Sequence, residues 1–114
     1  MTLMKNAYKK GDIILIKYPF TNLIEFKVRP ALVLRNQDDN DVIVIPISTA
    51  INLRKFDLVI KKNNYSKKPL PVKSAIRIGK IATIQSDLIV KKITKLKKEV
   101  FKAVINKFLN YLLN

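Results

Sequence analysis

Two apolar runs flank one polar turn in residues 27–49, which read KVRPALVLRNQDDNDVIVIPIST. The run over 30–35 begins with a proline, which a strand tolerates at its first position because no ladder hydrogen bond needs the missing N–H there. The run over 42–47 is rich in β-branched residues and is typical of a buried strand. Asparagine and aspartate residues at 36–41 favour a turn. The stretch therefore predicts a β-hairpin.

Shorter apolar runs on both sides of this hairpin predict the remaining strands. In chain order we expect strands at 13–18 (ended by Pro19) and 57–61, two strand halves at 74–78 and 80–84 that meet in a bend at Gly79, a helical turn at 86–88, and a weak edge strand at 89–96. The segments between them are predicted to be loops, at 20–28, 49–56 and 62–71.

The C-terminus carries the pattern of an amphipathic helix. Its apolar residues recur at spacings of three and four, at Val100, Phe101, Val104, Ile105, Phe108, Leu109 and Leu112. Lys97 and Lys98 stand where an Asp or Ser would suit the start of a helix, so its N-terminus is poorly capped. We therefore expect a mainly β fold with a C-terminal helix packed on it, arranged as a small half-open β-barrel.

Composition limits what kind of protein this is. A chain of 114 residues with 48% apolar residues is long enough for one domain, 1–114, with a real core. It has no Cys and no His, which excludes disulfides, a thiolate nucleophile, the usual zinc sites and imidazole catalysis. The eight acidic residues form no catalytic pair, and we interpret Asp38, Asp39 and Asp41 as a turn rather than a calcium loop.

Membrane and nucleotide-binding signals are missing from the sequence. No run approaches 18 consecutive apolar residues, and residues 1–10 lack the apolar core of a signal peptide. Neither glycine-rich pattern of nucleotide-binding loops occurs. We therefore expect a cytoplasmic protein that neither enters a membrane nor holds a nucleotide in such a loop.

The charge of the chain is strongly positive and unevenly distributed. Residues 1–60 hold 9 basic and 6 acidic side chains, whereas residues 61–114 hold 14 basic and 2 acidic ones, for an overall net charge of +15. Such an imbalance favours an anionic partner, either a nucleic acid or an acidic protein. The alternative is compositional drift, because 19 of the 23 basic residues are lysines, as an AT-rich genome would produce.

The predicted hairpin places an arginine near a hydroxyl. Arg29 and Ser48 each lie seven residues from their end of the turn at 36–41, so antiparallel pairing sets them roughly opposite one another. A guanidinium beside a hydroxyl can bind the oxygens of one phosphate. The alternative is that Arg29 caps backbone carbonyls and that Ser48 and Thr49 form a turn.

Five segments in this order resemble the MazF/PemK family of toxin endoribonucleases from type II toxin–antitoxin modules. They are Gly11–Ile14 with Tyr18–Thr21, Lys27–Leu34, Val44–Thr49, Ile76–Ile84 and the closing helix. The resemblance covers nearly the whole chain. It implies an SH3-like barrel that forms a homodimer, and metal-independent, cofactor-free cleavage of single-stranded RNA by its own 2′-hydroxyl. It also implies an acidic antitoxin as protein partner.

The resemblance also assigns roles to residues. Arg29 would stabilise the charge of the transition state and donate a proton to the leaving oxygen, and Ser48 would orient the scissile phosphate. The family usually has Thr where this chain has Ser48, so the following Thr49 is the alternative hydroxyl. The loop that precedes Lys27 lacks glycine and carries Glu25. The residues expected to bind substrate are Thr21, Lys27, Arg54, Arg77 and Lys80.

Two other functions remain open at this point. One is a non-catalytic SH3-like module that binds RNA or DNA through its basic half, and the other is a module that binds only an acidic protein. Four aromatic residues in or beside loops could stack on bases or belong to the core, namely Phe20, Phe26, Phe56 and Tyr65.

Overall fold

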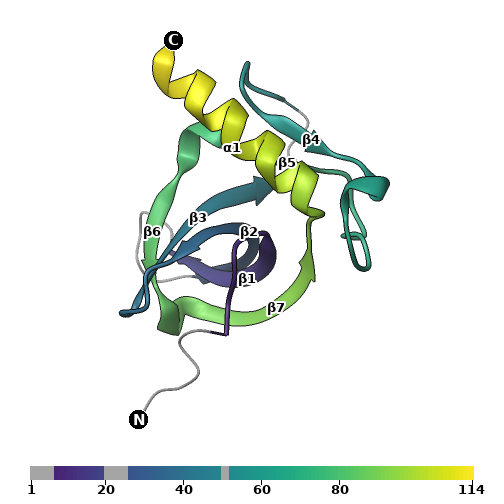
Figure 1. Ribbon diagram of the computed structural model, residues 1–114. Coiled ribbons are helices and arrows are strands. Elements are labelled where there is room, and N and C mark those ends of the chain that lie inside the picture. Colours follow the sequence, from purple (N-terminus) through teal and green to yellow (C-terminus); the bar gives the residue numbers. More distant parts are fainter. Residues whose placement is uncertain (1–6, 20–25, 50–51) are drawn as a thin grey trace.

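A curved antiparallel sheet and one helix make up the fold, as Figure 1 shows for a computed structural model that describes residues 7–19, 26–49 and 52–114. The strands are β1 (Asp12–Pro19), β2 (Phe26–Asn36), β3 (Asp41–Ser48), β4 (Leu58–Ile60), β5 (Ser74–Ile76), β6 (Ala82–Gln85) and β7 (Ile89–Lys95). The described residues also form the 3₁₀ turns η2 (Lys62–Asn64), η3 (Ile78–Lys80) and η4 (Ser86–Leu88), and the helix α1 (Lys98–Leu113). The predicted fold class is confirmed.

The β2–β3 hairpin lies at the centre of the sheet. Neighbouring strands follow the order β4-β5-β3-β2-β1-β7, and β6 pairs with β3. Ala31 lies opposite Pro46 and Val33 opposite Val44, as the prediction assumes, although a bulge between Val33 and Arg35 separates these pairs from the Asn36–Val42 pair beside the turn. Within the turn, Asp38 has a φ of 62°, a conformation that Asp tolerates better than most residues. The interpretation of this segment as a turn is confirmed.

Both faces of the three central strands are buried. Ile13, Leu32 and Ile45 belong to one core cluster, which also contains Val104 of α1. Ile14 and Val44 belong to a second cluster on the opposite face, which Ile84 and Ile89 cover. Because successive side chains of a strand point to opposite faces, two buried faces require uninterrupted apolar runs. This is why these strands were readable from the sequence.

The start of β2 differs from the prediction. Residues 26–28 were expected in a loop and Pro30 at the first position of a strand, yet β2 begins at Phe26. Lys27 and Val28 pair with Tyr18 and Lys17 of β1, which carries the hairpin into exposed, partly charged sequence. Pro30 is tolerated inside β2 because the pairing between β2 and β3 ends at Ala31, so that β1 alone is its neighbouring strand.

The predicted bend at Gly79 separates two strands that pair with different parts of β3. β5 lies opposite Ile47 and Ser48, whereas β6 lies opposite 41–44. The 3₁₀ turn η3 joins them and passes beneath α1. A Cβ atom on Gly79 would lie 3.1 Å from the Tyr111 hydroxyl oxygen, closer than most such contacts, so a side chain here would require the exposed Tyr111 ring to shift slightly. The turn expected at 86–88 and the edge strand after it are also confirmed.

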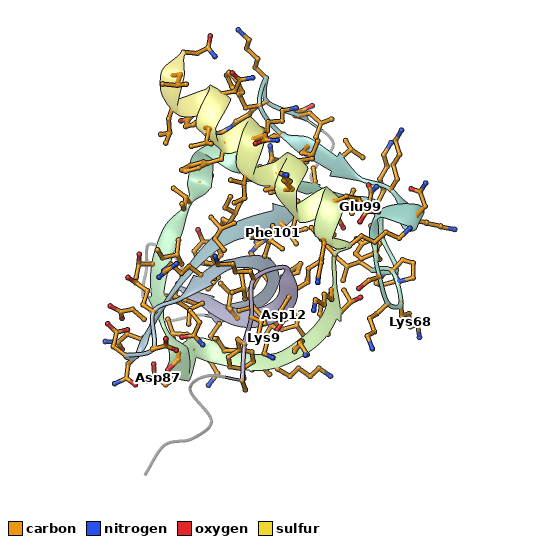
Figure 2. All side chains as sticks on the ribbon, viewed as in Figure 1. Lys9, Asp12, Lys68, Asp87, Glu99 and Phe101 are labelled. Atoms are coloured by element: carbon orange, nitrogen blue, oxygen red, sulfur yellow. The ribbon has the colours of Figure 1, made fainter. Side chains whose placement is uncertain are left out.

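The helix α1 begins without a side-chain cap, as its two leading lysines predict. Phe101, in its first turns, points toward the curved sheet (Figure 2). Val104 is fully buried, but Leu109 and Leu112 are 50% and 59% exposed. The predicted apolar face is therefore wrong in the last turns, where the described residues leave the helix partly uncovered. None of the described helices is long and apolar enough to cross a bilayer.

Candidate active site

The hairpin register places Arg29 and Ser48 at the same end of the central sheet. Each lies two residues beyond the Ala31–Pro46 pair, so alternation puts both side chains on the face that Ala31 and Pro46 share. Beyond that pair β2 and β3 no longer pair with each other. Arg29 pairs with Ile16 of β1, and Ser48 pairs with Ala75 of β5. Both side chains are half-buried. That Arg29 and Ser48 bind one phosphate together stays a prediction, which the register of β2 and β3 supports.

A second guanidinium reaches the candidate hydroxyl. Nη2 of Arg77 donates a hydrogen bond to Oγ of Ser48 at 3.4 Å. The backbone N–H of Arg77 donates to the carbonyl oxygen of Pro46 at 3.0 Å, which ties the residue to the end of β3. Arg77 was expected only among the substrate-binding residues. The structure brings it next to Ser48.

The guanidinium of Arg77 is itself held in place. Its Nη1 forms an ion pair with Oδ2 of Asp57 and donates to the carbonyl oxygen of Asn52 at 3.2 Å. The side chains of Arg77 and Asp57 are only 14% and 2% exposed. A cation fixed by several partners needs little reorganisation when charge develops beside it, which is how preorganised sites stabilise transition states. The sequence did not predict Asp57 as a site residue. The only sign in the sequence is that an acidic residue stands alone before a short apolar strand.

Open space adjoins the two candidate hydroxyls. One pocket of about 220 Å³ is lined by Ser48 and Thr49 together with Lys73 and Ser74. A second pocket of about 320 Å³ also contacts Thr49 and extends to Pro30, the residue that follows Arg29. Thr49 is exposed and lies between the two pockets. A substrate in this space would therefore contact Thr49 as well as Ser48.

The other predicted substrate-binding residues are spread over the surface. Lys27 is exposed in β2, Lys80 is exposed in η3, and Arg54 is exposed at the start of the turn that leads to Asp57. Thr21, Phe20 and Glu25 lie outside the described residues, as does the side chain of Phe26. Two of the aromatic residues belong to the core. Tyr65 is buried in the larger core cluster, and Phe56 is partly buried and packs against that cluster.

Metal ligands do not gather at this site. Over residues 7–19, 26–49 and 52–114, no group of three His, Cys, Asp or Glu side chains is placed to hold an ion. The polar groups around Ser48 include the Arg77 guanidinium, the hydroxyls of Thr49 and Ser74, and Lys73. Such a set suits the binding of an anionic phosphodiester.

Comparison with known structures shows the same fold in several toxins. An endoribonuclease in complex with its cognate antitoxin, from Mycobacterial species, has 15% identity over 95% of this chain and 94% of that chain, with a TM-score of 0.68. A MazE-MazF structure from Deinococcus radiodurans has 14% identity over 92% and 95%, with a TM-score of 0.74. The Mycobacterium tuberculosis toxin MazF-mt6 has 19% identity over 85% and 93%, with a TM-score of 0.64.

The sequence itself carries the family assignment. No curated protein matches it significantly. Residues 9–112 do match the family described as PemK-like, MazF-like toxin of type II toxin-antitoxin system. This match spans nearly the whole chain, including Arg29, Ser48 and Arg77. The chain belongs to the PemK-like, MazF-like toxins of type II toxin–antitoxin systems.

Proposed function

We propose that this toxin is an endoribonuclease that cleaves single-stranded RNA at short sequence motifs. The 2′-oxygen of one nucleotide attacks the adjacent phosphorus while the bond from phosphorus to O5′ breaks. The 2′-hydroxyl releases its proton to water and O5′ takes one up from water, which leaves a 2′,3′-cyclic phosphate and a 5′-hydroxyl. Both the nucleophile and the leaving group belong to the RNA, so the protein needs only to position the phosphate and stabilise its charge.

One observation carries this proposal: the guanidinium of Arg77, fixed by a buried carboxylate, lies against the Ser48 hydroxyl at the end of β3. Arginine stays protonated at any working pH and is a donor rather than a base. Arg29 then stabilises the charge on the phosphoryl oxygens and donates to the leaving oxygen, and Ser48 orients the phosphate. Thr49, exposed at the adjoining pockets, is the alternative hydroxyl.

The protein partners follow from charge and from exposed apolar surface. A net charge of +15 suits an acidic antitoxin, and a structural neighbour is described as an endoribonuclease in complex with its cognate antitoxin. The last turns of α1 expose Leu109, Leu112 and Leu113, the last of them by 85%, which suits burial against a second copy in a homodimer. We place the toxin in the cytoplasm, where its messenger RNA substrate is translated.

The test is incubation of the purified protein with a long unstructured RNA in EDTA, followed by mapping of both new ends. We expect discrete cuts at a recurring short motif, cyclic phosphate on one product and a free 5′-hydroxyl on the other. An intact RNA that nevertheless binds the protein would support the non-catalytic nucleic-acid-binding module instead. Cuts that require added divalent metal would contradict the proposed mechanism.

A further inference from the structure

Asp57 is one of two carboxylates that the described part of the chain buries. Its residue is 9% exposed and its side chain 2%, and the other buried carboxylate is that of Asp12. Taking an ionised carboxylate out of water is costly unless it is paired and hydrogen-bonded. Oδ2 of Asp57 meets that requirement with the Arg77 guanidinium and with the backbone N–H of Arg54 at 2.7 Å.

The ion pair determines the direction in which Arg77 points. A guanidinium is planar and presents its N–H groups in a fixed fork. Nη1 is held by Asp57 and by the carbonyl oxygen of Asn52, so the plane of the group is set and Nη2 is directed at Oγ of Ser48. The Nη2–Oγ distance of 3.4 Å makes this a long hydrogen bond.

Asp57 is held in turn by the helix. The backbone N–H of Asp57 donates to the carbonyl oxygen of Arg54 at 3.0 Å, which closes the turn at 54–57. Nζ of Lys107 in α1 donates to the carbonyl oxygen of Asp57 at 3.5 Å, and the rings of Phe56 and Tyr111 meet edge to face at 5.2 Å. A carboxylate held rigidly in this way is suited to fixing the orientation of a neighbouring side chain.

We infer that Asp57 is a positioning residue, which fixes the guanidinium of Arg77 so that it holds the Ser48 hydroxyl toward the scissile phosphate; this rests on the proposed function. Asp57 contacts Arg77 and Arg77 contacts Ser48, so the influence of Asp57 on the hydroxyl passes through Arg77. A hydroxyl that accepts a hydrogen bond from a guanidinium can still donate its own O–H. The hydrogen bond from Arg77 therefore leaves Ser48 able to act as a donor to a phosphate oxygen of bound RNA.

The test compares Asp57→Asn with a matched control, Asp12→Asn. Asp12 is 1% exposed, accepts the backbone N–H of Lys9 at 2.8 Å and lies 3.8 Å from Nζ of Lys92, near the start of β1 (Figure 2). Both substitutions remove a buried charge. We expect Asp57→Asn to lower the single-turnover cleavage rate about 10- to 100-fold, the scale of a misplaced catalytic group, with RNA affinity nearly unchanged. Asp12→Asn should keep the parent rate in its folded fraction.

A double-mutant cycle with Ser48→Ala separates positioning from general stability. If Asp57 acts through the Ser48 hydroxyl, Asp57→Asn should cost little further rate once that hydroxyl is gone. A purely structural role would cost the same factor in both backgrounds. Equal factors, or an Asp57→Asn variant that cleaves like the parent, would overturn the inference.

A measurement without cleavage keeps the inference testable apart from the proposed function. Nitrogen-15 NMR of the Arg77 side chain in the parent should show slow rotation of the guanidinium, because Asp57 and Asn52 hold one of its ends. Free rotation in the parent would overturn the inference even if RNA is cleaved. Slow rotation that speeds up in Asp57→Asn, in a parent that cuts no RNA, would support the positioning role while the proposed function fails.

Discussion

Arg77 contacts the candidate hydroxyl from the segment after β5, whereas Arg29 stands in β2 at the same end of the hairpin. Arg77 follows β5 and is anchored through Asp57 to the turn before β4. Arg29 stands in β2, beside Ile16 of β1 and directly before Pro30, which lines a pocket shared with Thr49. A phosphate between them would meet positive charge on both sides. Each guanidinium should therefore be needed, because neither can occupy the position of the other.

Substitution of Arg29 by alanine should remove a charge-stabilising donor and slow RNA cleavage by about a hundredfold or more. The loss should appear in the rate of bond cleavage under single-turnover conditions, with a smaller effect on RNA affinity. Arg35→Ala is the matched control, because Arg35 is exposed in the same strand near the turn. Parent-like cleavage by Arg29→Ala would show that another group carries this role.

Tyr65 should make the fold sensitive to high pH. Burial raises the pKa of its phenol above the ordinary 10.0, and a hydrogen bond from the backbone of Leu70 opposes this in part. The unfolded chain thus loses this proton at lower pH than the folded one, so the free energy of unfolding falls as pH rises above 10.0. Denaturant titrations at about pH 9 and pH 11 should show a smaller fall for Tyr65→Phe than for the parent. An equal fall in both proteins would contradict it.

Elements with two buried faces were the ones that the sequence predicted best. The hairpin of β2 and β3 needs continuous apolar runs, and these are plain at 30–35 and 42–47. Residues 26–28 join β2 through backbone pairing with β1, which leaves no apolar pattern to find. Asp57 could not be predicted as part of the site, because its role depends on Arg77, twenty residues away along the chain. Arg29 and Ser48 were predicted from the turn alone, and their placement at one end of the hairpin depends also on the bulge between Val33 and Arg35.

Val104 is the fully buried side chain of α1, and Val100, Phe101, Ile105 and Phe108 of the same helix pack against the core while partly buried. Val104→Ala removes two methyl groups from the larger core cluster and leaves a cavity, so the free energy of unfolding should fall by about 2 kcal/mol. Asn106→Ala, at an exposed position of the same helix, should change it by less than about 0.5 kcal/mol. Urea unfolding measures both. Equal effects would mean that the helix adds little to the core.

At the scale of the whole molecule, exposed lysines line the pockets beside the candidate site. Lys73 lines the pocket that contains Ser48, and Lys61 and Lys62 line a neighbouring pocket of about 340 Å³ that also contains Lys73. All three side chains are exposed. They belong to the half of the chain with 14 basic and 2 acidic residues. An RNA strand that leaves the site along these pockets would place its phosphates beside them.

Replacing these three lysines by glutamine should therefore weaken RNA binding and flatten its dependence on salt. Each phosphate contact contributes about −0.7 to the slope of log affinity against log salt for a single strand, so three lost contacts should change the slope by about 2. The matched control replaces Lys9, Lys10 and Lys17 by glutamine. These lysines are exposed but do not line the pockets, and their replacement removes the same net charge. If affinity depended only on overall charge, both triple variants would lose the same slope. A loss confined to the first variant would mean that the strand follows the pockets.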